Sequence, residues 1–308
     1  MLLPEGLNPG AYTPFDRNGR LNQKQLAEEL RLVTRGVGGL HGPSTHAEYV
    51  SLTLSDWKAW AETVIDVAQG AGVKAWPFLG SESFEKTLEQ ATHAMKLGAD
   101  GIFVMAPYFN KYSQESAFEY YRDIASTFSD TPIVIYPSHM TGNHFSPATI
   151  ARIAALPNIV GIKMAPDNEF ADTAKIVLSA ETNPSFNPVA GGLLQLYPLM
   201  KGVDIKASCS ALSNFAHDWS LNLWTAYLAK DWPTVRKWHL KLARIAAVLS
   251  SGPGGGAQAG HKAAIRLLGR DVGEMRRPGL PATDEHVARI RKVFEEEGLF
   301  ESQAANTA

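Results

Sequence analysis

The chain has 308 residues, of which 45% are hydrophobic and 19% are charged, and its formal net charge at pH 7 is −2. This balance suits a globular protein with a large core, and it gives neither nucleic acid nor an anionic membrane an electrostatic footprint. A single cysteine, Cys209, excludes an intrachain disulfide, and no apolar stretch approaches the roughly 20 residues of a membrane span. The opening residues lack a signal-peptide pattern, so we expect a cytoplasmic protein.

Short apolar runs alternate with longer amphipathic runs as far as residue 208. The predicted strands are Gly10–Thr13, Gly39–Gly42, Ala75–Leu79, Gly101–Ala106, Ile133–Tyr136, Val160–Met164, Phe186–Ala190 and Ile205–Ser208. The predicted helices are Leu21–Gly36, Ser55–Gly70, Ser83–Leu97, Gln114–Thr127, Ser146–Leu156, Glu169–Ala180 and Leu193–Met200. Eight strands alternating with helices predict an α/β fold, the (β/α)₈ TIM barrel, with its active site at the carboxyl ends of the strands.

The pattern becomes helical from Phe215 onward. Trp219, Leu223 and Tyr227 recur at helical spacing, which favours a packing surface over a cofactor contact. A terminal helix is predicted over Glu285–Glu297. We therefore expect residues 1–214 to form the barrel and residues 215–308 to form a C-terminal helical extension packed on it, in a single structural unit.

Two reactive side chains stand at the ends of predicted strands. Lys163 follows the apolar run that begins at Ile159, and Tyr136 ends the run Ile133–Tyr136. A free lysine titrates near ~10.4, and desolvation can lower that pKa by up to roughly 3–5 units. A neutral lysine can attack a carbonyl to form an imine, and a tyrosine can carry the protons. The structural alternative is a lysine beside a carboxylate and a core tyrosine whose hydroxyl is satisfied.

Four short motifs occur in an ordered series along the chain. They are Ala11–Gly19, Ser44–Glu48 with Ser51–Thr53 after it, Ala106–Asn110 and Gly161–Lys163. Together they resemble the dihydrodipicolinate synthase / N-acetylneuraminate lyase family of class I aldolases over nearly the whole chain. The chain resembles a divergent member of that family rather than a true dihydrodipicolinate synthase.

The resemblance implies a mechanism. Lys163 condenses with the ketone of pyruvate or a longer 2-oxo acid, Tyr136 shuttles protons, and Thr45 can pass them on. The imine on Lys163 requires no cofactor or metal. The loop Ser44–His46 binds the substrate carboxylate, for which backbone N–H groups and the Thr45 hydroxyl make a suitable anion cradle. A hydroxyl-capped turn leading into the next helix is the structural alternative for this loop.

The departures from the family pattern limit the function. The carboxylate loop usually reads Gly-Thr/Ser-Thr-Gly-Glu, whereas here Ser44 and Ala47 replace its glycines and His46 replaces a hydroxyl. Side chains at these positions are expected to alter the loop's shape. Phe109 stands where synthases carry a second tyrosine, so the proton relay to a neighbouring subunit is interrupted. Met140 stands where synthases carry an arginine for a second carboxylate, which argues against a role in lysine biosynthesis.

Further polar residues are predicted near the ends of the strands. His46 and His139 are candidates for substrate binding or proton transfer, with His41 more remote. The remaining substrate-binding candidates are Gly191 and Ser208, while Lys206 could contact substrate or point outward into a salt bridge. The histidines are scattered and show no metal-ligand spacing.

We therefore predict a lyase that forms an imine with a 2-oxo acid. Retro-aldol cleavage releasing pyruvate and dehydration of a 2-oxo-3-deoxy sugar acid both begin with that imine, and the sequence does not choose between them. A sensor or accessory protein that binds 2-oxo acids without turnover is the alternative. The family forms tetramers, and Tyr108, Phe109 and Tyr112 would form an apolar patch on one loop, so a homodimer or homotetramer is expected.

Overall fold

The computed structural model describes residues 3–137, 143, 145–164, 179, 181–195, 205–252 and 257–304. The chain divides into two compact units. The barrel unit comprises Met1–Asn8, Val37–Gly42 and Val64–Ser210, and the helical unit comprises Pro9–Gly36, Pro43–Thr63 and Ala211–Ala308. The last segment of the helical unit begins close to the predicted boundary at residue 215. The packing of 215–308 on the barrel as a single structural unit stays a prediction.

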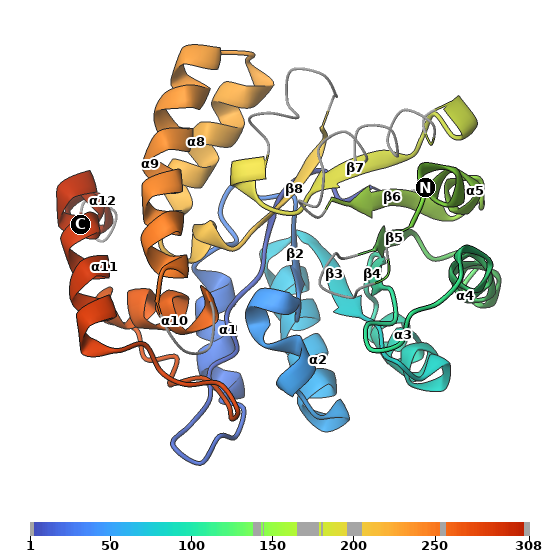
Figure 1. Cartoon of the computed structure of the whole chain (residues 1–308), viewed down its shortest axis with the longest axis horizontal. Helices are drawn as coiled ribbons and strands as arrows, with labels where there is room; N and C mark the ends of the chain where they lie inside the picture. The colour runs from blue at the N-terminus through green and yellow to red at the C-terminus, as the bar shows by residue number, and fades with distance from the viewer. Residues whose placement is uncertain are drawn as a thin grey trace. The chain divides into compact units, whose positions relative to one another are not determined.

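Eight parallel strands form the barrel (Figure 1). They are β1 (Gly6–Pro9), β2 (Gly39–Gly42), β3 (Lys74–Leu79), β4 (Ile102–Met105), β5 (Ile133–Tyr136), β6 (Ile159–Lys163), β7 (Asn187–Ala190) and β8 (Ala207–Ser210). The sheet runs in the order β1-β8-β7-β6-β5-β4-β3-β2. A backbone hydrogen bond from Gly38 N–H to Leu7 C=O, 2.9 Å long, links the segment entering β2 to β1. The predicted (β/α)₈ barrel is confirmed.

The strand bounds were predicted with uneven success. β2 and β5 have the predicted bounds, whereas β8 begins and ends two residues later than predicted and β1 begins and ends four residues earlier. The predicted first strand, Gly10–Thr13, was wrong, because its residues are fully buried without being part of a strand. A short apolar run reports burial, and it does not report which backbone conformation is buried.

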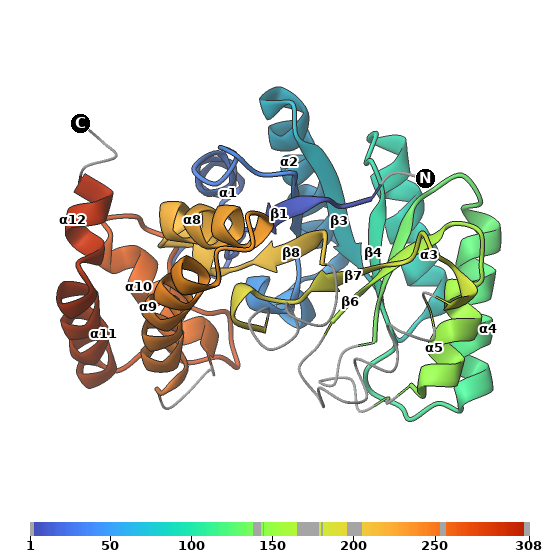
Figure 2. The ribbon, with the colours of Figure 1, turned by 90° about the horizontal axis from the view of Figure 1, so that it is seen from above.

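The helices of the barrel unit lie outside the strands (Figures 1 and 2). They are α3 (Phe84–Lys96), α4 (Gln114–Thr127) and α5 (Pro147–Ala154), and α2 (Leu54–Ala71) belongs partly to each unit. Serines cap the first three: Ser83, Ser113 and Ser146 accept a hydrogen bond from the backbone three residues on. The predicted helix Glu169–Ala180 lies almost entirely outside the described residues, and of the predicted Leu193–Met200 only the 3₁₀ turn η4 (Leu193–Gln195) is described.

The helical unit contains the remaining described helices. They are α1 (Gln23–Arg31), the 3₁₀ turns η1 (Thr45–Ala47), η2 (Tyr49–Ser51) and η5 (Leu212–Asn214), then α8 (His217–Leu228), α9 (Trp232–Ser250), α10 (Ala257–Leu267), α11 (Asp284–Glu297) and α12 (Leu299–Ala304). The aromatic stripe of α8 is buried, and Trp219 packs against Trp238 of α9 with ring centroids 5.9 Å apart. The predicted packing surface is confirmed. None of the described helices is long and apolar enough to cross a membrane.

One buried amide fixes the start of β6. Asn158 is 2% exposed, and its Nδ2 donates to the carbonyls of Ala125, Phe128 and Thr131, at 3.1, 2.8 and 3.2 Å. These bonds join the entrance of β6 to the end of α4 and to the turn before β5. The hydrogen bonds of Asn158 therefore help to fix where β6 begins, and with it the position of Lys163, the last residue of the strand.

We predict that Asn158→Leu lowers the free energy of unfolding by about 1–3 kcal/mol, because it leaves buried carbonyl groups without a donor. Urea denaturation followed by circular dichroism measures this. Asn222→Leu, the same substitution on an exposed position of α8, should change stability by less than about 0.5 kcal/mol. Equal effects of the two substitutions would contradict a structural role for the Asn158 amide.

Candidate functional site

An amine and a phenol meet at the carboxyl ends of β5 and β6. Ile135 pairs with Ile162 in the parallel register, so the next residue on each strand, Tyr136 and Lys163, lie side by side. The Lys163 Nζ is 3.7 Å from the centre of the Tyr136 ring and 5.6 Å from the centre of the Phe78 ring. Lys163 is 5% exposed and Tyr136 is 4% exposed. Lys163 and Tyr136 both end their strands, and two aromatic rings lie near the amine.

The structural alternative for this pair requires a carboxylate beside Lys163 and a partner for the Tyr136 hydroxyl. Among the described residues, no carboxylate forms an ion pair with Lys163 and no group hydrogen-bonds the Tyr136 hydroxyl. The faces of the Tyr136 and Phe78 rings interact favourably with a lysine head group. Burial also raises the pKa of the Cys209 thiol on β8 to about 11, against the opposing effect of the Lys163 charge.

The loop Ser44–Glu48 has a conformation that its substituted positions tolerate. Ser44 is extended, with φ −116°, and Ala47 lies in η1 outside the left-handed region. Glu48 is the left-handed residue of the loop, with φ 57° and ψ 37°. Neither Ser44 nor Ala47 needs the conformational freedom of glycine in this loop, and the expectation that their side chains alter its shape relative to the family stays a prediction.

The three predicted binding residues of this loop are grouped together. Ser44 is 1% exposed, and its Oγ forms a 2.7 Å hydrogen bond with His46 Nδ1. Thr45 and His46 are half-buried. The histidine ring contacts Tyr12 edge to face, with centroids 5.2 Å apart. Ser44 thus fixes the ring orientation of His46, and Thr45 stands between these two residues in the sequence.

Other predicted residues have less uniform surroundings. Gly191 follows the last residue of β7 and is half-buried. Ser208 is fully buried within β8, and its hydroxyl donates to the Cys209 carbonyl over 3.0 Å. Lys206 precedes β8 and is exposed, so it stands at the opposite end of that strand from Ser210.

Of the remaining histidines, His41 is buried in β2, and its Nδ1 lies 2.6 Å from the carbonyl oxygen of Asn8 in β1. His41 therefore joins β2 to β1 inside the barrel. His139 and Met140 lie outside the described residues. The described residues contain no group of three or more His, Cys, Asp or Glu side chains arranged to hold a metal ion.

The aromatic loop after β4 is fixed by two residues that the sequence gave no reason to select. The Glu82 carboxylate accepts the backbone N–H groups of Tyr108 and Phe109. Asn143 Nδ2 donates to the Pro107 carbonyl, 2.8 Å away, and its Oδ1 accepts the N–H of Tyr112, also at 2.8 Å. These contacts join residues about 30 positions apart, so no local motif could reveal them.

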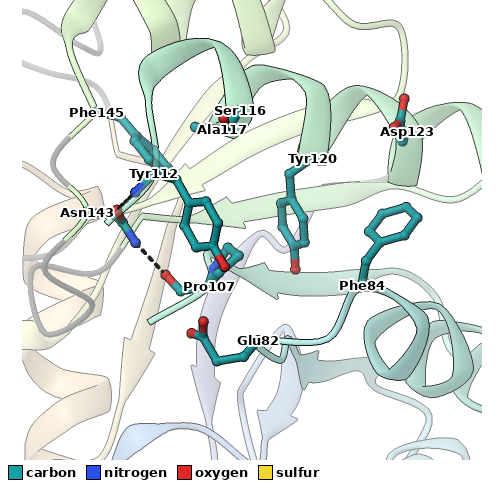
Figure 3. Close-up of a pocket in the computed structure, with 10 residues that line it drawn as sticks. All are labelled: Glu82, Phe84, Pro107, Tyr112, Ser116, Ala117, Tyr120, Asp123, Asn143 and Phe145. Atoms are coloured by element: carbon teal, nitrogen blue, oxygen red, sulfur yellow. Dashed lines mark hydrogen bonds between the residues drawn. The ribbon is translucent and has the colours of Figure 1, made fainter. Parts of the chain in front are cut away.

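A cavity of about 330 Å³ opens beside this loop (Figure 3). Tyr112 and Tyr120 turn their hydroxyls toward the side where Glu82 lies, and Asn143 closes another side (Figure 3). Neither Lys163 nor Tyr136 lines this cavity. We place the candidate site at the lysine and tyrosine, because reactive chemistry identifies a site more specifically than the size of a cavity does.

The chain matches known proteins along nearly its whole length. The model of the dihydrodipicolinate synthetase family matches residues 4–297. The chain belongs to this family. It is 31% identical over 303 residues to a 4-hydroxy-tetrahydrodipicolinate synthase of Thermotoga maritima, which covers 96% of this chain and 99% of that protein. An uncharacterised DapA-like lyase of Halobacterium salinarum is 29% identical over 300 residues, covering 96% of this chain and 94% of its own length.

A solved structure extends the similarity to three dimensions. The structure of a prophage protein of the dihydrodipicolinic acid synthase family from E. coli K12, in complex with pyruvate, matches with a TM-score of 0.87 and 27% identity. The match covers 97% of this chain and 100% of that one. The low identities fit a divergent family member, and family membership supports a lyase of the class I aldolase type.

A histidine packed behind the loop gives a prediction on pH dependence. His261 of α10 stacks on Tyr12 at 5.2 Å and on Phe215 at 5.6 Å. Burial lowers the pKa of His261 to about 4, against a hydrogen bond to the Ala257 carbonyl that raises it, while the charge of His286 lowers it further. The unfolded chain takes up this proton near ~6.5 and the folded protein does not, so falling pH between these values favours unfolding.

We predict that His261→Phe, which keeps a ring in the stack, removes about 2–3 kcal/mol of the stability lost between pH 7 and pH 4. Urea denaturation of both proteins at each pH measures the difference. Measuring both proteins at pH 7 and pH 4 cancels the contributions of the other titratable groups, which the two chains share. If the two proteins lose the same stability over this range, His261 does not stay neutral in the fold.

Proposed function

We propose that this chain is a lyase that acts on a 2-oxo acid through an imine on Lys163. The observation that supports this best is the buried Lys163 amine at the end of β6, beside Tyr136 and without a carboxylate partner among the described residues. Reactive lysines are found in buried surroundings beside groups that can carry protons. Membership of the family supports the same chemistry.

In the proposed reaction the Lys163 amine adds to the ketone carbon. The carbonyl oxygen takes up protons and leaves as water, so that a C=N bond replaces the C=O bond. The protonated imine then withdraws electrons from the adjacent carbon, which permits the next bond to break. Tyr136 donates and accepts the protons of these steps, since it is the titratable side chain next to the amine on the neighbouring strand.

The loop Ser44–His46 binds the substrate carboxylate in this proposal. Its backbone N–H groups and the Thr45 hydroxyl are neutral donors, which suit an anion without requiring a buried cation. Because Phe109 has no hydroxyl, Tyr136 exchanges protons through Thr45, His46, substrate or water in this proposal. His46, Gly191 and Ser208 contact the rest of the substrate. His139 keeps this role as an expectation from the sequence.

Two reactions are consistent with this chemistry. Retro-aldol cleavage breaks the bond between C3 and C4 and releases pyruvate, and dehydration of a 2-oxo-3-deoxy sugar acid breaks the bond between C4 and oxygen. Lysine biosynthesis is not part of the proposal. The residue where synthases carry an arginine is Met140, whose side chain cannot pair with a second carboxylate.

We also propose that the protein works as a homodimer or homotetramer in the cytoplasm. Phe109 is 84% exposed and Tyr112 is 39% exposed on one loop. Glu82 and Asn143 fix the backbone of that loop, so these side chains stay presented to solvent in a single chain. A second copy that covers the loop would remove this apolar surface from water.

The two central residues can be separated by the step that each serves. We predict that Lys163→Ala abolishes both the adduct formed with pyruvate and borohydride and all turnover. Tyr136→Phe keeps the ring against the amine, so the adduct should still form, more slowly, while turnover falls by about 10²–10⁴-fold. Intact mass spectrometry with peptide mapping measures the adduct, and a screen of 2-oxo acids supplies the substrate for the rate measurements.

The control is Lys241→Ala, whose lysine lies in α9 and donates to the Glu297 carbonyl. It should leave both readouts unchanged. An adduct that maps to another lysine, or its absence with every 2-oxo acid, would refute the imine mechanism. Near-normal turnover of Tyr136→Phe would mean that another group shuttles the protons.

If the protein is a dimer or tetramer, light scattering at micromolar concentration should give a mass at least twice that of the single chain. Phe109→Asp places a charge at a residue that is 84% exposed, the highest value among the large apolar residues that the structure describes, and should shift the equilibrium toward the single chain. Leu280→Asp, at an exposed position of the helical unit, is the matched control and should leave the mass unchanged. A wild-type protein that is monomeric under these conditions would rule out the proposed assembly.

A further inference from the structure

Glu48, the last residue of the carboxylate loop, combines two unfavourable features. Its backbone is left-handed, with φ 57°, which side chains other than glycine rarely adopt. Its carboxylate is also withdrawn from water, since the residue is 4% exposed. Such a conformation persists only where the surrounding structure holds it. The groups that hold Glu48 therefore determine the shape of the loop.

Those groups come from the C-terminal extension. Lys262 of α10 is fully buried, and its Nζ lies 2.6 Å from Glu48 Oε1. The same Nζ donates to the Glu274 carbonyl at 2.9 Å and lies 4.6 Å from the centre of the Phe15 ring. The Arg276 backbone N–H donates to the other carboxylate oxygen of Glu48 at 3.0 Å. Both charges of the pair are thus hydrogen-bonded as well as paired.

The same face of α10 holds the other end of the turn. Gln258 lies four residues before Lys262, so the two side chains share one face of the helix. Its Nε2 donates to the Thr45 carbonyl at 3.2 Å. One helix face therefore holds Thr45, the first residue of η1, through its backbone and Glu48, which caps η1, through its side chain.

We propose that Lys262 and Gln258 are positioning residues for substrate carboxylate binding: together they hold Thr45–Glu48 in the one backbone conformation that presents its donors to a 2-oxo acid. This inference rests on the proposed function of the loop. Removal of Lys262 leaves a buried carboxylate without its cation, and Glu48 must then turn toward water. That rotation changes its backbone angles and displaces η1.

A buried ion pair is a demanding way to fix a turn. Burial lowers the pKa of Lys262, and the charge of Glu48 opposes that effect, so desolvation and attraction compete within the pair. Apolar residues could fill the same volume, but they would not fix the backbone of Glu48 through both carboxylate oxygens. The pair supplies orientation, which the turn Thr45–Ala47 requires if its donors are to converge on an anion.

The test compares pyruvate with acetone, which is a ketone without a carboxylate. Borohydride trapping with each compound gives an adduct-forming efficiency, and the ratio of the two measures carboxylate recognition separately from the reactivity of Lys163. We expect Lys262→Met, Glu48→Gln and Gln258→Leu to lower this ratio by about 10–100-fold, with acetone trapping unchanged. Lys241→Met, the same change on α9, should keep the wild-type ratio.

Folding is controlled within the same series. If the single charge variants do not fold, the double variant Glu48→Gln/Lys262→Met carries no unpaired charge, and Gln258→Leu leaves the pair intact. A wild-type ratio in any folded variant of the pair together with Gln258→Leu would overturn the inference. A wild-type protein that traps neither compound would instead refute the proposed imine chemistry, and the inference would fall with it.

Discussion

Parallel pairing of β5 with β6 is the constraint on which the proposed chemistry depends. Parallel strands bring their carboxyl ends to the same edge, and the register that pairs Ile135 with Ile162 leaves Tyr136 and Lys163 as neighbours. This pairing brings the Lys163 amine to 3.7 Å from the centre of the Tyr136 ring. A shift of one residue in either strand would turn its last side chain to the opposite face.

The loops that leave the strands are held by side chains from distant parts of the sequence. Glu82 accepts two backbone N–H groups of the loop after β4, and Asn143 bonds the same loop from another side. Glu48 is held by Lys262 in the same manner. In each case a buried or half-buried polar group satisfies backbone or charge that would otherwise face the protein interior alone. The loops thereby gain a defined shape without regular secondary structure.

The sequence predicted the strands near the reactive residues better than it predicted those at the start and end of the barrel. β5 was predicted to the residue and β6 within one, because each is a continuous apolar run with a sharp boundary. The first strand was predicted four residues too late, since the buried loop of Ala11, Tyr12 and Thr13 has the composition of a strand. The first strand is instead Gly6–Pro9, a run whose glycine, asparagine and proline are all poor strand formers.

The sequence by itself determined the barrel, the strand ends that carry Lys163 and Tyr136, and the family, because periodicity and short motifs are local properties that survive at low identity. Only the tertiary structure decided that no described carboxylate neutralises Lys163 and that Glu48, rather than Ser44 or Ala47, takes the left-handed conformation. It alone joined Lys262 and Gln258 to residues 45–48. Contacts across more than 200 residues depend on how the chain packs, and the energy of a buried pair depends on surroundings that no local pattern encodes.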